Sequence, residues 1–292
     1  MKRRQFLKTA LASTLASSAA FQALALSQNN RYRKEIGIQL YTLRNELKED
    51  TIGTIKAVAD AGYKQVEPYG FPNAELMIQA AKDNGMAVNS SHFDWEAVTN
   101  PSKKGTTPFG KTLEEAKKVG LTHLVVPYVH EENRTNLDAY KRLAENCNRA
   151  ALKAKEAGIQ LSYHNHAFEF QPQQSGKTGY DILMNEFAPE MKFEMDVFWV
   201  VIGGADPVKL IKNLKGRVSQ LHLKDVKKGM SLPEFGKVPN DAFKELGNGS
   251  IDMEPIIQAA DKAGVAHCHV EQDQSPHPIK SIQQSIQYLG EM

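Results

Sequence analysis

Histidine and carboxylate side chains recur near the ends of several short segments that read as β-strands. In the run Gln220-Leu221-His222-Leu223-Lys224 the polar residues share one face and the leucines share the other, because side chains alternate along a strand. Residues 193–197 and, less regularly, residues 162–166 alternate in the same way. This alternation places on one face, near strand ends, Gln39, Glu67, His92, His164, His166, Glu194, Asp196, His222, Lys224, His269 and Glu271.

Neutral imidazoles mixed with carboxylates are the ligands of a divalent transition metal (Mn, Zn, Co or Fe) rather than of calcium. A single buried histidine is more often a hydrogen-bonded core residue than a ligand. A structural role alone, however, gives no reason for so many of these residues to gather at one end of successive strands. The set as a whole therefore predicts a metal or active site.

Eight strand-like segments alternate with amphipathic helical segments and must position these residues. The predicted strands are 35–41, 64–68, 87–92, 123–127, 159–165, 192–198, 218–224 and 265–271, and the predicted helices include 51–61, 74–84, 111–118, 137–157, 251–263 and 278–289. Glycines at 62, 85, 158 and 264 close four of these helices. Eight such units without a linker-like segment predict an α/β fold, a single (β/α)₈ TIM barrel, whose active site lies at the carboxyl ends of the strands.

Composition places the 292-residue chain among ordinary globular proteins, with 41% hydrophobic and 24% charged residues. The net charge of +2 hides an asymmetry, because the first 25 residues hold four basic residues and no acidic one. The remaining 32 basic and 34 acidic residues give the body a net charge of −2, which argues against a nucleic-acid partner. The two cysteines, Cys147 and Cys268, form no CxxC motif and are predicted to be buried free thiols.

The first 25 residues predict an export signal, which leaves residues 26–292 as the barrel domain. Lys2, Arg3, Arg4 and Lys8 form a basic region, an Ala/Leu/Ser stretch follows, and Ala23-Leu24-Ala25 fits a cleavage site. The run from Arg3 to Lys8 resembles the twin-arginine signal, whose pathway exports folded proteins. We therefore expect a periplasmic protein with no membrane anchor after cleavage. An uncleaved anchor is the alternative, but the Ser/Thr-rich stretch is a poor membrane span.

Motifs at the strand ends resemble the sugar phosphate isomerase/epimerase superfamily, the xylose-isomerase-like TIM barrels, over essentially the whole mature chain. No single motif is diagnostic of the superfamily. The order of the motifs and their positions at strand ends together are a strong signal. They are residues 37–44 (GIQLYTLR), 62–67 (GYKQVE), 163–169 (YHNHAFE), 195–199 (MDVFW), 221–225 (LHLKD) and 269–271 (HVE).

The resemblance implies one divalent metal held by four residues at strand ends, typically Glu, Asp, His and Glu. Asp196, His222 and Glu271 match three of these positions. His164 stands where many members carry the first glutamate, which keeps a ligand but removes one negative charge and one base. The predicted ligand set is therefore His164, Asp196, His222 and Glu271.

The same resemblance implies proton transfer next to a sugar carbonyl, performed in many members by two carboxylates on opposite faces of the substrate. With His164 in place of one glutamate, a one-base elimination becomes an alternative, as in inosose dehydration or β-elimination from a 3-keto-glycoside. The predicted catalytic residues are Glu271, His166 or Glu169 as base, and Lys224 as electrostatic stabiliser of an enolate. For Lys224 and Glu169 the alternatives are an ion pair at the rim and a loop-capping hydrogen bond.

Gln39, Glu67, His92 and Trp199 are the predicted substrate-binding residues, and the indole is placed to stack on a sugar ring. The long segment 226–250 reads as a lid or binding loop. We expect a free or keto sugar as the small-molecule partner, not a phosphosugar, and leave a homo-oligomer open. The two competing interpretations are a carbohydrate-binding barrel that has lost its chemistry, and a three-metal endonuclease of the same fold, which the charge and the export signal disfavour.

Overall fold

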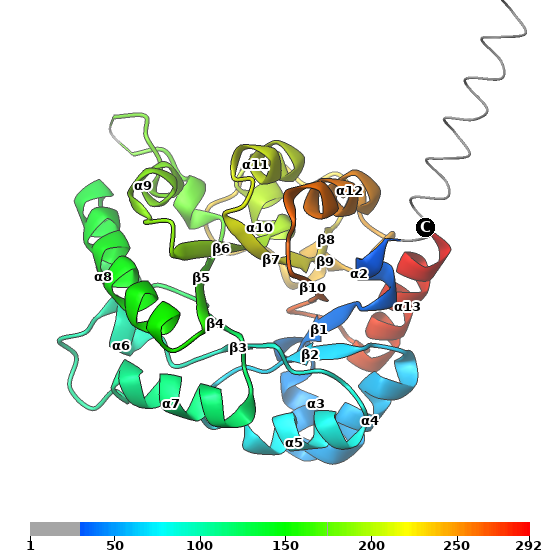
Figure 1. Cartoon of the computed structure of the whole chain (residues 1–292). Helices are drawn as coiled ribbons and strands as arrows, with labels where there is room; N and C mark the ends of the chain where they lie inside the picture. The colour runs from blue at the N-terminus through cyan, green and yellow to red at the C-terminus, as the bar shows by residue number, and fades with distance from the viewer. Residues whose placement is uncertain (1–29, 174) are drawn as a thin grey trace, which may run out of the picture.

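The computed structural model describes residues 30–173 and 175–292 and shows a single (β/α)₈ barrel (Figure 1). The predicted export signal and its cleavage site lie outside the described residues. Each predicted barrel strand corresponds to an observed one. Their bounds are β1 Gly37–Gln39, β2 Gln65–Glu67, β3 Ser90–His92, β4 His123–Val126, β5 Gln160–His164, β6 Met191–Asp196, β7 Val218–Leu223 and β10 His267–Val270.

All eight strands are parallel and follow the order β2-β1-β10-β7-β6-β5-β4-β3. Strands β2 and β3 close the barrel through isolated parallel bridges, including Gln65 with Ala87 and Phe71 with Phe93. In the part of the chain that is described, a second, two-stranded antiparallel sheet pairs β8 (Asp225–Val226) with β9 (Phe243–Lys244). These two strands lie at the start and near the end of the segment 226–250 that was predicted as a lid, so part of this segment forms regular secondary structure.

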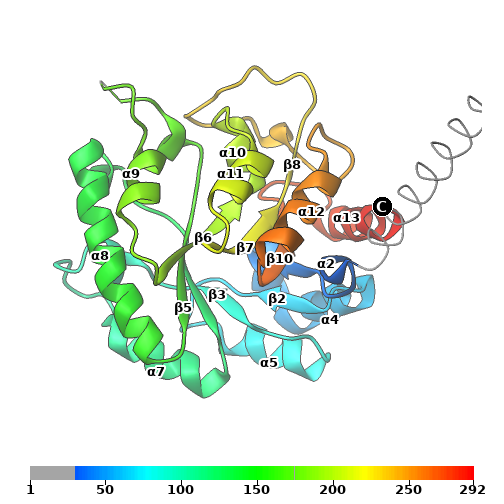
Figure 2. The ribbon, with the colours of Figure 1, turned by 45° about the horizontal axis from the view of Figure 1, so that its top comes forward.

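Helices surround the strands on the outside (Figures 1 and 2). The larger ones are α4 Thr51–Ala61, α5 Glu75–Asp83, α7 Phe109–Val119, α8 Leu137–Glu156, α9 Gly179–Glu186, α11 Pro207–Asn213, α12 Met253–Ala263 and α13 Pro278–Glu291. The shorter ones are α2 Arg31–Lys34, α3 Arg44–Glu49, α6 Glu96–Thr99, α10 Val197–Ile202 and the 3₁₀ turns Leu40–Leu43, Glu131–Asn133, Phe168–Phe170 and Asn240–Ala242. The four predicted closing glycines all have positive φ, from 72° to 107°, as a left-handed C′ residue requires.

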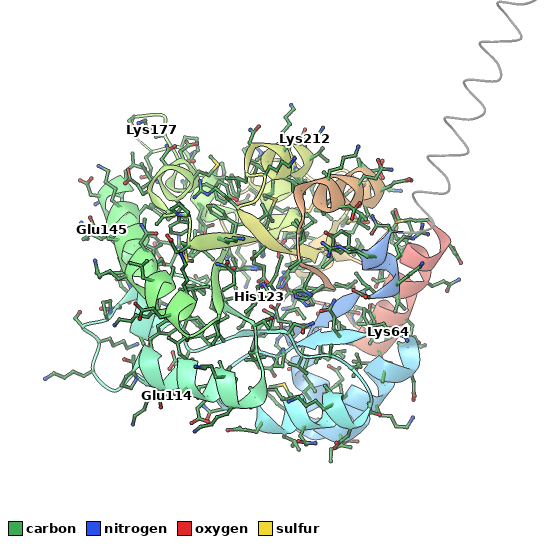
Figure 3. The ribbon with its side chains drawn as sticks, in the orientation of Figure 1. Lys64, Glu114, His123, Glu145, Lys177 and Lys212 are labelled. Carbon is green, nitrogen blue, oxygen red and sulfur yellow. The ribbon has the colours of Figure 1, made fainter. Side chains whose placement is uncertain are left out.

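The apolar core lies between the strands and the helices. The leucines of β7, Leu221 and Leu223, are fully buried on the outer face of the sheet, and the polar residues between them face the barrel interior. Figure 3 shows His123, at the start of β4, near the middle of the barrel, whereas Glu114 and Glu145 lie on the surrounding helices. The interior of this barrel is therefore lined by polar side chains.

The prediction for the two cysteines is met. Cys147 and Cys268 are buried and free. No helix in residues 30–173 and 175–292 is long and apolar enough to cross a membrane.

Candidate metal centre and active site

Four side chains from four strand ends converge at the carboxyl end of the barrel, and we call them the upper group: His164 (β5), Asp196 (β6), His222 (β7) and Glu271, which follows β10. One ligand atom from each lies within 4.8 Å of the other three, and none of the four residues is more than 4% exposed. Asp196 and His222 are register partners on neighbouring strands, which explains their proximity. The structure thus brings together the four residues that the sequence predicts as ligands.

Lys224 adds a positive charge to this group. Its ammonium Nζ lies 2.9 Å from Asp196 Oδ2, 2.7 Å from Glu271 Oε2 and 2.9 Å from Asp273 Oδ2. Burial alone would lower the pKa of Lys224, but Asp196, Asp273 and Glu271 outweigh it and hold that pKa well above its usual value. The ammonium therefore stays charged and balances the carboxylates. It lies in the site and does not form a simple ion pair at the rim.

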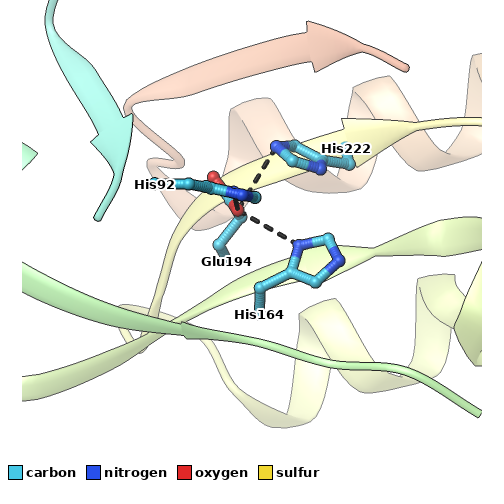
Figure 4. A group of neighbouring side chains, drawn as sticks. All are labelled: His92, His164, Glu194 and His222. Atoms are coloured by element: carbon cyan, nitrogen blue, oxygen red, sulfur yellow. Dashed lines mark hydrogen bonds and ion pairs between the residues drawn. The ribbon is translucent and has the colours of Figure 1, made fainter. Parts of the chain in front are cut away.

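Glu194, two residues before Asp196 on β6, lies one layer deeper. Figure 4 shows three imidazoles converging on its carboxylate. Oε2 of Glu194 lies 2.8 Å from His92 Nε2, 3.1 Å from His164 Nδ1 and 3.2 Å from His222 Nε2. Burial alone would raise the pKa of Glu194, but the charges of His222 and His92 hold it well below its usual value.

Glu67 and Gln39 also belong to this deeper layer, which corrects their prediction as substrate-binding residues. Both are fully buried, and Gln39 Nε2 donates to Glu67 Oε2 at 2.8 Å. The same carboxylate oxygen lies 2.7 Å from His222 Nε2, while Oε1 accepts from Ser90 and Gln220. Glu67 therefore holds the ring of His222 from below, as carboxylates commonly do for histidines that bind metals.

His222 has a carboxylate at each ring nitrogen, because its Nδ1 lies 2.8 Å from Glu271 Oε2. Burial would lower the pKa of His222, but Glu194 and Glu271 outweigh it and raise that pKa well above its usual value. His92 is 8% exposed, and Glu194 and Glu67 likewise raise its pKa against the effect of burial. Its close contact with Glu194 makes it part of the layered network rather than a free substrate-binding group.

His166 and Trp199 form the apolar side of the site. The half-buried ring of His166 lies 5.2 Å from the ring of His164, 5.3 Å from that of Trp199, and stacks on Phe168 at 5.2 Å. Its Nδ1 has no hydrogen-bond partner. Burial, followed by the positive fields of His164 and Lys224, lowers the pKa of His166 well below its usual value, so the ring is neutral at pH 7. The ring is therefore a neutral base beside the upper group.

Glu169, the other predicted base, points away from the upper group, and this corrects its assignment. The 3₁₀ turn Phe168–Phe170 buries its carboxylate completely, with Oε1 accepting from the Tyr163 hydroxyl at 2.7 Å and Oε2 from the His166 amide at 2.8 Å. Burial raises the pKa of Glu169 to about 8. The residue holds the backbone of His166 in place.

Asp225 anchors residues 247–251, at the end of the segment predicted as a lid. Its two carboxylate oxygens accept from four backbone amides, those of Val226, Gly247, Gly249 and Ile251, at 2.8 to 3.0 Å. The carboxylate is 1% exposed and follows Lys224 directly. The turn at 247–251 is thereby tied to the strand that carries His222 and Lys224.

Sequence reasoning missed several groups of the layered network. Glu194 and His269 were recognised as inward-facing but received no role, and Gln220, Ser90 and Asp273 received none either. Gln220 Nε2 donates to Glu67 Oε1 at 2.9 Å, to Ser90 Oγ at 2.8 Å and to Glu194 Oε1 at 3.0 Å. The signal for Gln220 and Glu194 was present, since both precede a predicted site residue by two positions on the same strand.

With this geometry established, the comparisons with known proteins define the class. The xylose isomerase-like TIM barrel family matches residues 55–292, so the chain belongs to that family. Inosose dehydratase from Clostridium perfringens is 26% identical over 271 residues, which cover 84% of this chain and 91% of the relative.

Among solved structures, a sugar phosphate isomerase/epimerase from Parabacteroides distasonis is 26% identical, with a TM-score of 0.71 over 87% of this chain and 97% of the other. The IOLI protein, solved with a binding zinc atom, superposes with a TM-score of 0.64 at 16% identity, over 88% of this chain and 95% of the other. At that identity the last likeness shows the shared fold alone.

Proposed function

We propose that the chain is a metal-dependent sugar-modifying enzyme that removes a proton next to the carbonyl of a free or keto sugar and then expels a β-substituent. The observation that carries the proposal is the upper group, with the neutral His166 ring beside it. The similarity to inosose dehydratase supports a dehydration or related elimination.

The upper group fits a divalent transition metal. It offers two imidazole nitrogens and two carboxylate oxygens within 4.8 Å of one another, in a buried setting. This is the donor chemistry of Zn, Mn, Co or Fe sites. A metal bound there would supply Lewis-acid polarisation of the substrate carbonyl.

The residues of the chain supply the rest of the reaction. The neutral ring of His166 accepts the α-proton, and the electron pair of the broken C–H bond forms the enolate. The charged Lys224 ammonium stabilises the negative charge on the enolate oxygen. The enolate then re-forms the carbonyl while the bond to the β-substituent breaks, and that group leaves with its electron pair. The half-buried indole of Trp199 provides an apolar wall beside the base.

Elimination is favoured over epimerisation because the site holds one base, His166, and lacks the second of the two proton-transferring carboxylates that the family resemblance implies. His164 occupies its position, and Glu169 is committed to Tyr163 and the His166 amide. Isomerisation or epimerisation is the second candidate. It is favoured by the likeness to the sugar phosphate isomerase/epimerase and by the carboxylate of Glu271 within the site.

One experiment separates these candidates. The chain is loaded with Zn²⁺ or Mn²⁺ and incubated in D₂O with inosose and with 3-keto-glycosides, and elimination is followed by mass spectrometry and proton exchange by NMR. The proposal expects loss of water or aglycone, and loss of both signals in His166→Gln. Exchange without elimination would establish the epimerase or isomerase instead. If neither proton exchange nor elimination occurs, both enzyme candidates are refuted and the carbohydrate-binding barrel is left. His123→Gln, at the opposite end of the barrel, is the control.

We also propose that the protein is exported to the periplasm, as its basic N-terminal run suggests. Fractionation of cells that express the full chain and the double variant Arg3→Lys, Arg4→Lys tests this. Periplasmic protein that disappears in the variant is expected, and equal periplasmic amounts would contradict a twin-arginine route.

A further inference from the structure

A second set of ligand atoms lies beneath the upper group, and we call it the lower group: Glu67, Glu194, His222 and His269. Each comes from a different strand (β2, β6, β7 and β10), and all four are fully buried. One ligand atom from each lies within 4.8 Å of the other three. His222 is the one member shared with the upper group.

His269 is the member whose position lacks a structural explanation. Its ring is fully buried, yet neither Nδ1 nor Nε2 has a hydrogen-bond partner. Nδ1 is directed toward Glu67, with its Oε2 at 3.8 Å, which is too long for a hydrogen bond. An unpaired polar group is unfavourable in a protein interior, so a buried imidazole without partners points to a cation as its partner.

Gly37 on β1 makes room for this ring. The two residues are register partners, and a Cβ added at Gly37 would lie 2.3 Å from His269 Cδ2. Any other amino acid at position 37 would displace the ring from the lower group. The barrel therefore accommodates an imidazole that makes no hydrogen bond of its own.

The lower group also has the donor chemistry of a transition-metal site. It combines two carboxylates, Glu67 and Glu194, with two imidazoles, His222 and His269. The charges of His222 and His92 compensate the carboxylate of Glu194, and a divalent ion bound there would take the place of the protons on His222.

We propose that the lower group binds a second divalent transition-metal ion, of the kind that accepts mixed nitrogen and oxygen ligands, such as Zn²⁺. His222 faces the two groups with different atoms, Nδ1 toward Glu271 and Nε2 toward Glu67, so its ring would bridge the two ions after releasing its N–H protons to solvent. Tetrahedral metal–ligand bonds of about 2.0–2.2 Å place the ligand atoms roughly 3.4 Å apart. Pairs that are now up to 4.8 Å apart would therefore draw together, and His222 Nε2 and Glu67 Oε2, now 2.7 Å apart, would separate. The proposal is independent of the reaction proposed above.

Metal stoichiometry tests the proposal without an activity assay. The wild-type chain and the variants Asp196→Asn (upper group), His269→Gln (lower group) and His123→Gln (control) are saturated with Zn²⁺, freed of excess metal, and analysed by mass spectrometry for zinc per chain. Two ions are expected in the wild type and the control, and one in each of the other variants. Circular dichroism checks that each variant is folded, and anomalous diffraction of the wild type at the zinc edge locates the ions even if a variant fails to fold.

The other outcomes are distinguishable. One ion in the wild type that is lost in Asp196→Asn and kept in His269→Gln would overturn the lower site and leave the proposed function intact. One ion lost only in His269→Gln would support the lower site and overturn the upper ligand set. No bound zinc in the wild type would overturn both.

Discussion

Asp225 offers the sharpest test of how the loops at the site are held. Its carboxylate accepts from four backbone amides and is 1% exposed. In Asp225→Asn one oxygen still accepts from Val226 and Ile251, but the new amide group faces the N–H groups of Gly247 and Gly249, which then lose their acceptor. A hydrogen bond to a charged group contributes about 1.5–3 kcal/mol, so the loss of two predicts a destabilisation of at least about 3 kcal/mol.

Thermal unfolding followed by circular dichroism measures this effect. For a domain of this size 1 kcal/mol corresponds to roughly 2–4 °C, so the melting temperature should fall by roughly 6–12 °C. The matched control is Asp241→Asn, which removes an exposed carboxylate paired with Lys227 and should leave the melting temperature nearly unchanged. A melting temperature within about 2 °C of the wild type for Asp225→Asn would refute the reasoning.

Three other predictions concern the site and the opposite end of the barrel. Asp196→Asn should weaken metal binding at the upper group at least roughly 100-fold, measured by competition with a chelating dye; unchanged affinity would remove Asp196 from the ligand set. Trp199→Ala should raise KM by roughly 2–12-fold and change kcat less than this. Steady-state kinetics in which kcat alone falls would contradict a sugar-stacking role. Burial lowers the pKa of His123 to about 4, so the unfolded chain binds its proton first and stability declines as pH falls from about 6.5 to 4. His123→Gln should recover about 2 kcal/mol of this loss in urea unfolding, and parallel pH profiles for the two proteins would show that His123 does not titrate in this way.

Strand alternation predicted which face a residue occupies, and it was right for the polar residues of β6 and β7. It could not give depth along the barrel axis, since residues two apart on one strand share a face but lie in different layers. Glu194 and Asp196 illustrate this, because the first lies among imidazoles in the interior and the second lies in the upper group. Gln39 and Glu67 face the interior, as their alternation predicts, but lie in the deeper, fully buried layer.

Chain segments that turn immediately after a strand were the second source of error. The apolar run after Asp196 reads as a continued strand to residue 198, but the Asp196 side chain accepts from the Trp199 amide and starts α10 at Val197. The 3₁₀ turn that carries Glu169 similarly rotates its carboxylate toward Tyr163. Both outcomes depend on local hydrogen bonds that periodicity does not detect.

The layered interior explains why so many titratable groups are buried together. Barrel interiors of this fold are usually filled by branched apolar side chains, which need no partners. Here β7 places Gln220 and His222 on the inner face, and Lys224 follows directly after the strand. Each of the three pairs with carboxylates from other parts of the barrel. Such a network is stable only when nearly every member is satisfied. Because His222 contacts both layers, loss of its ring would leave Glu67 and Glu271 without a shared partner and disrupt the upper and lower groups together. The position of the proposed metal ligands is therefore set from beneath as well as from the mouth of the barrel.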